Sequence, residues 1–336
     1  MLCYNTVLAA KLRAAIQQKD LAELVIVRTF HGWCREQLRL YHVHIPASGE
    51  TFYDAVVERV ICGVDRGQIP RAQYGAVMID EGHDFRPEWL KVVTQMVDPS
   101  TNSLLVLFDD AQSIYDSNTK RKFSFSSVGI QAQGRTTILR LNYRNTSEVL
   151  SIAYNFAKDF IAPAEAEEDG VPLIHPQSAG RRGPLPVLNQ LGSLQEEADF
   201  IARELAAINK EGWPWREMAV LYRVGFIGEK TTKRLRAAGI PVQFLGEGNG
   251  KRGFDPNEDS VKVMTMHSSK GLEFPVVAIP GLGYMPYPDW DQREEAKLLY
   301  VAMTRAMEML LMTCHQESEF VARLKNTRAG AGGVAN

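Results

Sequence analysis

Residues 75–85 read GAVMIDEGHDF, and our interpretation of the chain begins with this segment. Its apolar run ends abruptly in two carboxylates, Asp80 and Glu81. Ligands bind at the carboxyl ends of strands in open α/β sheets, and an acidic residue there can hold Mg²⁺ on the phosphates of a nucleotide. A neighbouring glutamate can orient or deprotonate a water molecule. A strand end that is merely solvated has the same pattern, so this segment alone leaves both interpretations open.

The rest of the chain alternates short apolar runs with amphipathic stretches. The apolar runs predict buried strands of parallel sheets at residues 24–27, 75–79, 104–108, 219–222, 261–266 and 275–279. The amphipathic stretches predict helices at residues 6–18, 87–96, 196–208, 230–238 and 293–305. Strand–helix alternation of this kind predicts an α/β fold.

The composition is that of a globular protein of about two domains, with 336 residues, 45% hydrophobic and 23% charged. The net charge is −2, so any attraction to nucleic acid must come from a local basic groove. The four cysteines form no CxxC pair, which argues against a zinc ribbon and a secreted disulfide scaffold. No apolar run approaches the roughly 18 residues that cross a bilayer. We therefore expect a cytoplasmic protein without a membrane partner.

Two further segments could contact a nucleotide. In FDDAQSIYD (residues 108–116), Gln112 could sense a γ-phosphate by hydrogen bonding, although a polar loop after a core strand is the simpler explanation. In LRLNYRNTSEVL (residues 139–150), Arg144 precedes a helix that Asn145-Thr146 could cap. Taken alone, the second segment indicates only the start of a helix.

Two segments in the second half have similar ambiguity. VKVMTMHSSKGLEFPVVAI (residues 261–279) places a polar turn between two strands, and its His267 could be an ordinary packed histidine. EEAKLLYVAMTRAME (residues 294–308) is an amphipathic helix with Arg305 near its end. An arginine there could simply stabilise the helix dipole.

Taken together, the sequences of these segments and their order along the chain resemble the UvrD/Rep-like branch of the superfamily 1 DNA helicases. Seven segments are similar to boxes of that family: CYNTVLAAKL, VRTFHGWC, DEGHD, FDDAQSIY, LNYRNT, TMHSSKGLEFP and LLYVAMTRA. The resemblance runs from Leu2 to about Cys314, nearly the whole chain.

The resemblance implies two RecA-like motor domains with ATP bound between them. We expect the first at residues 1–145, with a short insertion at about 35–71, and the second at residues 146–326, with no large inserted subdomain. Residues 327–336 are expected to form a flexible tail.

By the same resemblance, four residues would carry out ATP hydrolysis. Glu81 would activate the attacking water, and Gln112 would contact the γ-phosphate. Arg144 and Arg305 would reach that phosphate as arginine fingers, a role that suits a planar and permanently charged guanidinium.

Three more residues would hold the nucleotide itself. The resemblance implies that Asp80 binds the Mg²⁺ of ATP, that Tyr143 stacks on the adenine and that Glu273 binds the ribose hydroxyl.

The resemblance also implies a path for single-stranded DNA, along which the motor would move from 3′ to 5′. Seven residues match positions where the family contacts the strand: Tyr4, Asn5, Thr29, His31, Tyr115, Thr265 and His267. Stacking of aromatic rings on bases tolerates any sequence, as a translocating motor requires. The expected partner is single-stranded DNA or a 3′-tailed duplex.

One expected element is absent from this sequence. The family's phosphate loop, GxxxxGK[ST], has no counterpart, and its nearest imitation at residues 246–252 (GEGNGKR) has the wrong glycine spacing and lacks the hydroxyl residue. Such a loop supplies backbone N–H groups, a lysine and a Mg²⁺ ligand. We therefore expect an N-terminally truncated helicase whose first domain lacks a strand, and which hydrolyses ATP poorly alone.

Two alternatives to an active helicase remain open. The chain could be a non-catalytic remnant that binds DNA or a protein partner, or one subunit of a split helicase whose partner chain supplies the phosphate loop. Otherwise we expect a monomer. DNA repair is one of several biological roles that the sequence does not distinguish.

Overall fold

The computed structural model describes residues 1–47, 49, 51–108, 124–137, 141–160, 177–246 and 254–331. The chain divides into two compact units, which are described separately below. Unit 1 comprises Met1–Ile138 with Ala164–Leu173, and unit 2 comprises Leu139–Pro163 with Ile174–Asn336. The contacts thus group residues 139–145 with unit 2, whereas the sequence led us to expect them at the end of the first domain.

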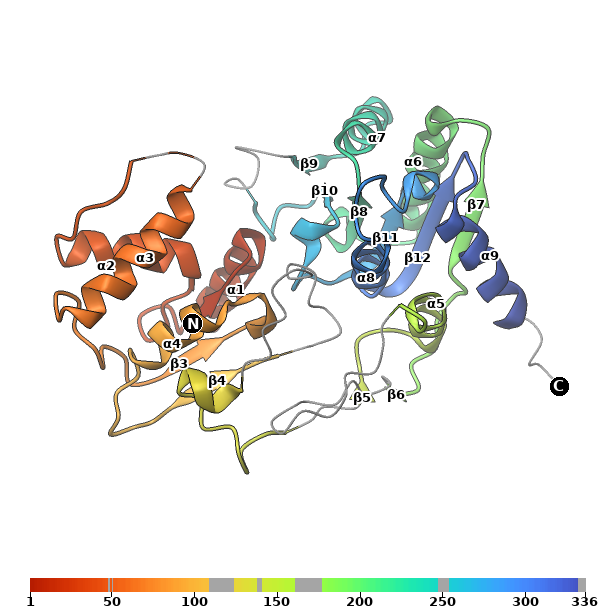
Figure 1. The fold of residues 1–336 in the computed structure, drawn as a ribbon. Coiled ribbons are helices and arrows are strands. Elements are labelled where there is room, and N and C mark those ends of the chain that lie inside the picture. The colour runs from red at the N-terminus through yellow and green to blue at the C-terminus, as the bar shows by residue number, and fades with distance from the viewer. Residues whose placement is uncertain are drawn as a thin grey trace. The chain divides into compact units, whose positions relative to one another are not determined.

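Unit 1 contains a parallel sheet of four strands in the order β2-β1-β3-β4 (Figure 1). Its strands are β1 (Leu2–Cys3), β2 (Arg28–Thr29), β3 (Val77–Ile79) and β4 (Leu104–Val106). The helices are α1 (Thr6–Gln18), α2 (Phe30–Leu40), α3 (Phe52–Asp65) and α4 (Pro87–Thr94), with short 3₁₀ turns η1 (Gly82–Asp84) and η3 (Phe125–Val128).

The strand predicted at residues 24–27 is wrong. The structure places β2 at Arg28–Thr29, and Leu24 and Ile26 are 80% and 57% exposed. Within the described parts of the chain, β2 pairs only with β1, which spans two residues, so this ladder does not extend back to residue 24. Val27 is buried all the same, because it packs under α1 with Cys3 and Leu8.

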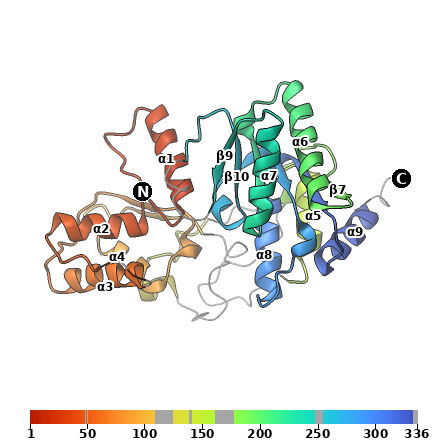
Figure 2. The ribbon, with the colours of Figure 1, turned by 90° about the horizontal axis from the view of Figure 1, so that it is seen from above.

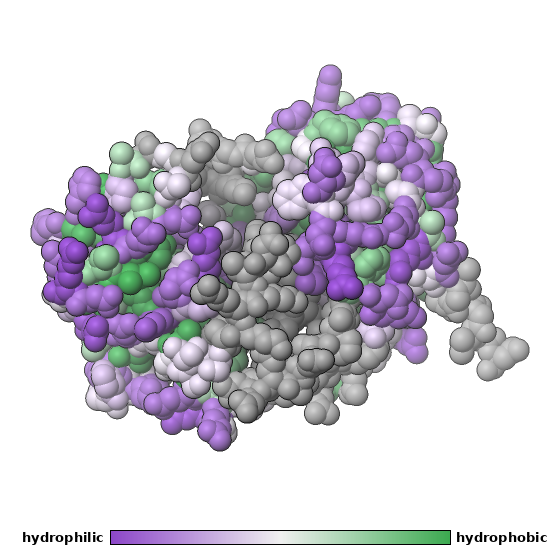
Figure 3. Space-filling view, viewed as in Figure 1, coloured by the Kyte–Doolittle hydropathy of each residue, from purple (hydrophilic) through white to green (hydrophobic). Residues whose placement is uncertain are grey.

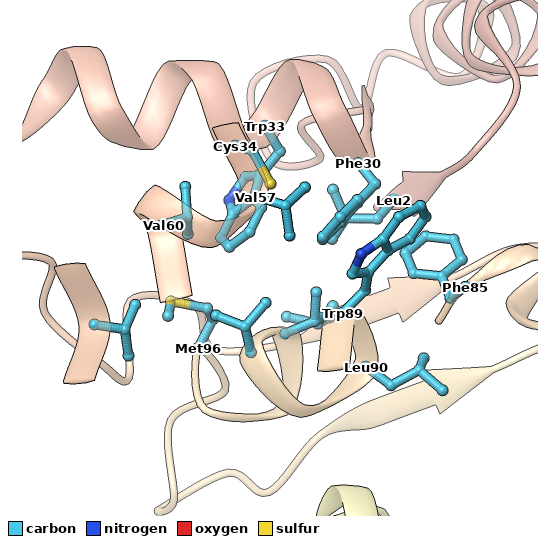
Figure 4. Packing of buried hydrophobic residues seen from close by; sticks show 14 of the residues in the cluster. Leu2, Phe30, Trp33, Cys34, Val57, Val60, Phe85, Trp89, Leu90 and Met96 are labelled. Atoms are coloured by element: carbon cyan, nitrogen blue, oxygen red, sulfur yellow. The ribbon is translucent and has the colours of Figure 1, made fainter. Parts of the chain in front are cut away.

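The main core of unit 1 lies on the other face of its sheet. Leu2 and Ile79 point into it from β1 and β3, and α2, α3 and α4 supply most of the remainder. Figure 4 shows its centre, where Phe30 and Trp89 lie against each other with Phe85 close by. Aromatic packing of this density fixes the ends of β1, β2 and β3 relative to one another.

Unit 2 contains a parallel sheet of six strands in the order β7-β12-β11-β8-β10-β9. Its strands are β7 (Val187–Gln190), β8 (Met218–Tyr222), β9 (Val242–Leu245), β10 (Val261–Thr265), β11 (Phe274–Ile279) and β12 (Ala306–Cys314). The helices are α5 (Ser147–Ala157), α6 (Leu194–Lys210), α7 (Gly225–Ala237), α8 (Gln292–Met303) and α9 (Glu319–Ala331). A separate pair joins β5 (Leu141–Asn142) to β6 (Gln177–Ser178), and three short 3₁₀ turns are η4 (Trp215–Glu217), η6 (His267–Ser269) and η7 (Leu282–Tyr284).

Helices cover both faces of this second sheet. α6 and α7 pack together on one face, and α5 and α8 lie on the other (Figure 2). Strands covered on both sides must be apolar throughout, which explains the uninterrupted runs of β8 and β11. The predicted α/β fold with two parallel sheets is therefore confirmed.

The surface of both units is mainly hydrophilic on the side that Figure 3 shows, with apolar residues gathered on unit 1 where Figure 1 shows α3. Helix α9 continues to Ala331, into the segment that we expected to be a tail. Among the described residues, none of the helices combines the length and apolar character that a membrane span requires.

Candidate functional site

The predicted residues of unit 1 gather at one edge of its sheet. Tyr4 and Asn5 directly follow β1, His31 comes just after β2, and Asp80 and Glu81 follow β3. Because these strands are parallel, their carboxyl ends meet at the same edge. Gln112 and Tyr115 lie outside the described residues.

The acidic turn after β3 is held by its own backbone. The carboxylate of Asp80 accepts the N–H of Glu81 at 3.0 Å, and the N–H of Gly82 donates to the carbonyl of Leu107 at 2.8 Å. A Cβ atom on Gly82 would lie 2.7 Å from Val106 Cγ1, so this close approach to β4 requires glycine. The turn is thereby fastened to the end of the neighbouring strand.

Glu81 has a strained backbone and a histidine beside its carboxylate. Its φ of 55° lies in the left-handed region, which side-chain-bearing residues adopt at a cost. Nε2 of His83, which is almost fully buried, lies 3.2 Å from Glu81 Oε2. The imidazole thus lies beside one carboxylate oxygen of the residue that we expect to act on a water molecule.

Two of the residues predicted to contact DNA, Asn5 and Thr29, are N-caps of helices. Asn5 Oδ1 accepts the N–H of Val7 at 2.8 Å and caps α1, while Thr29 Oγ1 accepts the N–H of Gly32 at 3.2 Å and caps α2. The caps place both residues at helix starts on the sheet edge.

Tyr4 and His31 present rings at the same edge. Their ring centroids are 5.7 Å apart in an edge-on arrangement, and Trp89 lies beneath both. Burial lowers the pKa of His31 to about 4, so its ring is neutral at physiological pH. It therefore offers a ring and a hydrogen bond rather than a positive charge.

Three other predicted residues, Arg144, Glu273 and Arg305, lie together in unit 2, and Asn145 connects the backbone segments of the two arginines. The buried side chain of Asn145 donates from Nδ2 to the carbonyls of Thr304 and Ala306, at 2.9 and 2.6 Å. These two carbonyls flank Arg305, and Asn145 follows Arg144 directly. One asparagine thus fixes the backbone of both predicted arginine fingers.

The two arginines are held differently. Arg305 is 2% exposed and donates to the carbonyls of Val301 and Leu272 at 3.1 and 3.0 Å. Arg144 is largely exposed, and its Nε lies 2.9 Å from Glu273 Oε2. Glu273 precedes β11 and Arg305 precedes β12, so this cluster lies at the amino ends of those neighbouring strands.

Tyr143 also belongs to this part of unit 2, and its ring is 68% exposed. An exposed aromatic ring is suited to stacking on a flat ligand.

Thr265 and His267 lie at the opposite, carboxyl end of β10. Thr265 Oγ1 accepts the N–H of Ser268 at 3.1 Å and lies 2.8 Å from the hydroxyl of Ser268. The N–H of Met266 donates to the carbonyl of Tyr222, which ties the turn to β8. The structure therefore separates these two residues from the cluster of Arg144, Glu273 and Arg305.

Three residues near this edge of the unit 1 sheet, Tyr53, Arg86 and Trp89, are not predicted from the sequence. Tyr53 contacts the ring of His31, and the guanidinium carbon of Arg86 lies 5.2 Å from the centroid of the Trp89 ring. Arg86 and Trp89 could have been noticed because they follow the acidic box directly. No local signal points to Tyr53, which α3 brings in from a distant part of the chain.

The chain is similar to known proteins in sequence. The family model described as the UvrD-like helicase C-terminal domain matches residues 137–249 and 248–317. A probable DNA helicase of Mycoplasma pneumoniae is 29% identical over 196 residues, covering 56% of this chain and 33% of that protein. The ATP-dependent DNA helicase PcrA of Staphylococcus aureus is 45% identical over 65 residues, covering 17% and 9%.

A solved structure, the C-terminal domain of a possible DNA helicase from Lactobacillus plantarum, aligns with a TM-score of 0.40 and 22% identity, covering 55% of this chain and 94% of that one. The chain spans a third or less of the curated relatives' length. The family model covers more than half of the 336 residues. The chain therefore belongs to the UvrD-like helicase family, through its C-terminal domain.

Proposed function

We propose that this chain forms the motor portion of an ATP-dependent DNA helicase or translocase that moves 3′ to 5′ along single-stranded DNA. The observation that carries the proposal is the cluster of Arg144, Glu273 and Arg305, which Asn145 assembles inside the region that matches the helicase family. Two guanidiniums and a carboxylate are the groups that recognise a triphosphate and a ribose.

In the proposed reaction, unit 1 supplies the groups that act on Mg²⁺ and water. Asp80 would bind the Mg²⁺ of ATP. Glu81, whose carboxylate lies beside the imidazole of His83, would accept a proton from the attacking water. Within the described ranges, histidine, cysteine and acidic side chains do not gather in threes as a metal site. Mg²⁺ in nucleotide sites usually binds one or two carboxylates and takes its other ligands from the phosphates and from water, and the same is proposed here.

The remaining nucleotide contacts would come from unit 2 and from Gln112. Arg144 and Arg305 would stabilise the charge that develops on the γ-phosphate, which Gln112 would also contact. Glu273 would exchange its ion pair with Arg144 for the ribose hydroxyl, and the exposed ring of Tyr143 would stack on the adenine.

The single strand would bind at the carboxyl edges of the two sheets. On unit 1 it would contact Tyr4, Asn5, Thr29 and His31, and on unit 2 it would contact Thr265 and His267. Tyr115, the seventh proposed contact, lies outside the described residues. The rings of Tyr4 and His31 and the hydroxyls of Thr29 and Thr265 favour contacts with bases and sugars over ion pairs with phosphates.

Among the residues that the structure describes, helices cover one face of the unit 1 sheet only in part. α1 packs over Cys3 and Val27, whereas Met78, Leu105 and Leu107 on the β3–β4 half of that face are 43%, 49% and 46% exposed. Parallel sheets are normally covered on both faces. A strand and helix that carry a phosphate loop, from the same polypeptide or from a partner chain, would bury these side chains beside β4.

The chain alone should bind single-stranded DNA but release phosphate from ATP only at background rate, because its sequence contains no phosphate loop. Phosphate release would be measured with and without DNA, with Glu81→Gln as the control for contaminating activity. DNA-stimulated turnover that Glu81→Gln abolishes would contradict this expectation.

Binding without turnover would also fit a non-catalytic DNA-binding protein, the second candidate. Adding a chain that carries the phosphate loop separates the two: restored turnover supports the motor, and its continued absence supports the binding protein.

Acid should destabilise unit 1 through His31. The pKa of His31 is lowered from 6.5 to about 4 by burial, so below about pH 6.5 the unfolded chain binds a proton that the folded chain does not. The contribution of neutral His31 to the free energy of unfolding is therefore fully present above about pH 6.5, and it is lost as the pH falls toward about 4. We expect a loss of about 1–2 kcal/mol in the free energy of unfolding between about pH 7 and pH 5, allowing for partial exposure of the ring.

Urea denaturation at the two pH values, in wild type and in His31→Gln, measures this loss. The variant should lose less stability than wild type over the same interval. Equal losses in both proteins would show that His31 does not titrate as described.

A further inference from the structure

Unit 1 carries a row of three rings that runs outward from the sheet edge. Tyr4 and His31 are 5.7 Å apart between centroids, and His31 and Tyr53 are 5.0 Å apart, both pairs edge-on. Tyr4 and His31 are partly buried, but Tyr53, in the first turn of α3, is 56% exposed. The exposed end of the row therefore comes from the short insertion rather than from the sheet.

A cation lies beside this row. Arg86 packs over Trp89, the ring beneath Tyr4 and His31, with 5.2 Å from its guanidinium carbon to the ring centroid. Its Nη1 lies 3.2 Å from Asp54 Oδ1, and both side chains are more than half exposed. Such an exposed pair contributes little to stability, so Arg86 can change partners at low cost.

The chemistry of this surface suits one ligand class. The solvent-exposed ring of Tyr53, which contacts His31, offers a face to an unpaired base, and a half-exposed guanidinium offers bidentate donors to a phosphate. We propose that Tyr53 stacks on a base of single-stranded DNA while Arg86 binds a neighbouring phosphate, and that Asp54 restrains Arg86 until the strand arrives. This inference rests on the proposed DNA-binding function and adds three residues to it.

The charges around the row are consistent with such a ligand. His31 is neutral because burial lowers its pKa, so Arg86 and the nearby Arg35 supply the positive charge. The opposing carboxylate is Asp54, which already contacts Arg86. Asp84 is buried and does not face the solvent.

Two probes separate base stacking from phosphate binding. The first is a fluorescent oligothymidylate of about 20 nucleotides, and the second is an abasic strand of the same length, which keeps the phosphates and lacks the bases. Binding of each to the full chain is followed by fluorescence anisotropy at several salt concentrations. Leu40→Ala, which removes a 60% exposed side chain from the same unit, is the matched control.

Tyr53→Ala should weaken oligothymidylate binding by roughly 5- to 100-fold and leave abasic binding unchanged, while Tyr53→Phe should keep wild-type affinity. Arg86→Ala should weaken both probes and lower the slope of log affinity against log salt by about 0.7. Asp54→Asn should tighten binding of both probes, a gain that a purely structural role would not produce.

The outcomes distinguish this inference from the function on which it rests. If wild type binds oligothymidylate and Tyr53→Ala binds it as well as Leu40→Ala does, the stacking role of Tyr53 is wrong and DNA binding stands. If Asp54→Asn and Arg86→Ala leave both probes unaffected, the phosphate contact is wrong. If wild type binds neither probe, DNA binding by this chain fails, and the inference fails with it.

Discussion

Replacing Phe30 with alanine should lower the free energy of unfolding of unit 1 by about 3–5 kcal/mol, the range for truncating a buried phenylalanine. Phe30 has no solvent exposure, and its ring centroid lies 4.8 Å from that of Trp89 and 5.4 Å from that of Phe85. Figure 4 shows it between α2 and α4, where neighbouring rings cannot all close the cavity that alanine would leave. Part of the loss therefore comes from the cavity itself.

Hydrogen exchange of α2 and α4 amides in increasing urea measures this loss within unit 1. Leu40→Ala, on the same helix but 60% exposed, is the control and should cost less than about 0.5 kcal/mol. Because His31 and Thr29 flank Phe30, the variant should also weaken single-strand binding. A Phe30→Ala protein as stable as Leu40→Ala would mean that this cluster does not support unit 1.

The elements that the sequence predicts best are those with a complete local signal. Helix α1 begins and ends at the predicted residues, Thr6 and Gln18, because a capping asparagine precedes an amphipathic run. Helix α2 was not predicted, although Phe30, Trp33, Cys34, Gln37 and Leu38 follow a helical spacing and are buried. The helical periodicity is thus present in the sequence, within the segment that resembles a family box.

The prediction of a strand at residues 24–27 is wrong for a different reason. LVIV has the composition of a strand, but a strand also needs a partner to bond with, and β1 offers only two residues. Residue composition reports burial and propensity, whereas pairing depends on the rest of the sheet.

The candidate site shows the same limit more strongly. Sequence alone names Arg144, Glu273 and Arg305, yet the ion pair of Arg144 with Glu273 joins residues far apart in the chain. Asn145 was noticed only as a possible helix cap. In the structure Thr146 caps α5, and Asn145 instead reaches the carbonyls of Thr304 and Ala306. The hydrogen bonds from Asn145 to residues 159 and 161 positions away can be seen only in the folded structure.

Replacing Asn145 with alanine should therefore destabilise unit 2 and loosen both arginines. Asn145 is 1% exposed, its Nδ2 serves two carbonyls and its Oδ1 accepts from Asn142 at 2.8 Å. Each buried group that loses its partner costs about 1–3 kcal/mol, so the expected loss in free energy of unfolding is about 2–5 kcal/mol. Hydrogen exchange in urea, read on β12 and α5, measures it.

Two further variants make the Asn145 argument specific. Asn155→Ala removes a half-buried asparagine from α5, whose Nδ2 donates to the hydroxyl of Ser151, and should change stability by less than about 0.5 kcal/mol. Asn145→Asp keeps the size of the side chain but turns a carboxylate oxygen toward the carbonyls of Thr304 and Ala306, so it should be at least as destabilising as alanine. If Asn145→Asp were tolerated, the amide donor would not be what holds the segment of Arg305 against that of Arg144. The cluster would then need another cause, and the proposed ATPase site would lose its main structural support.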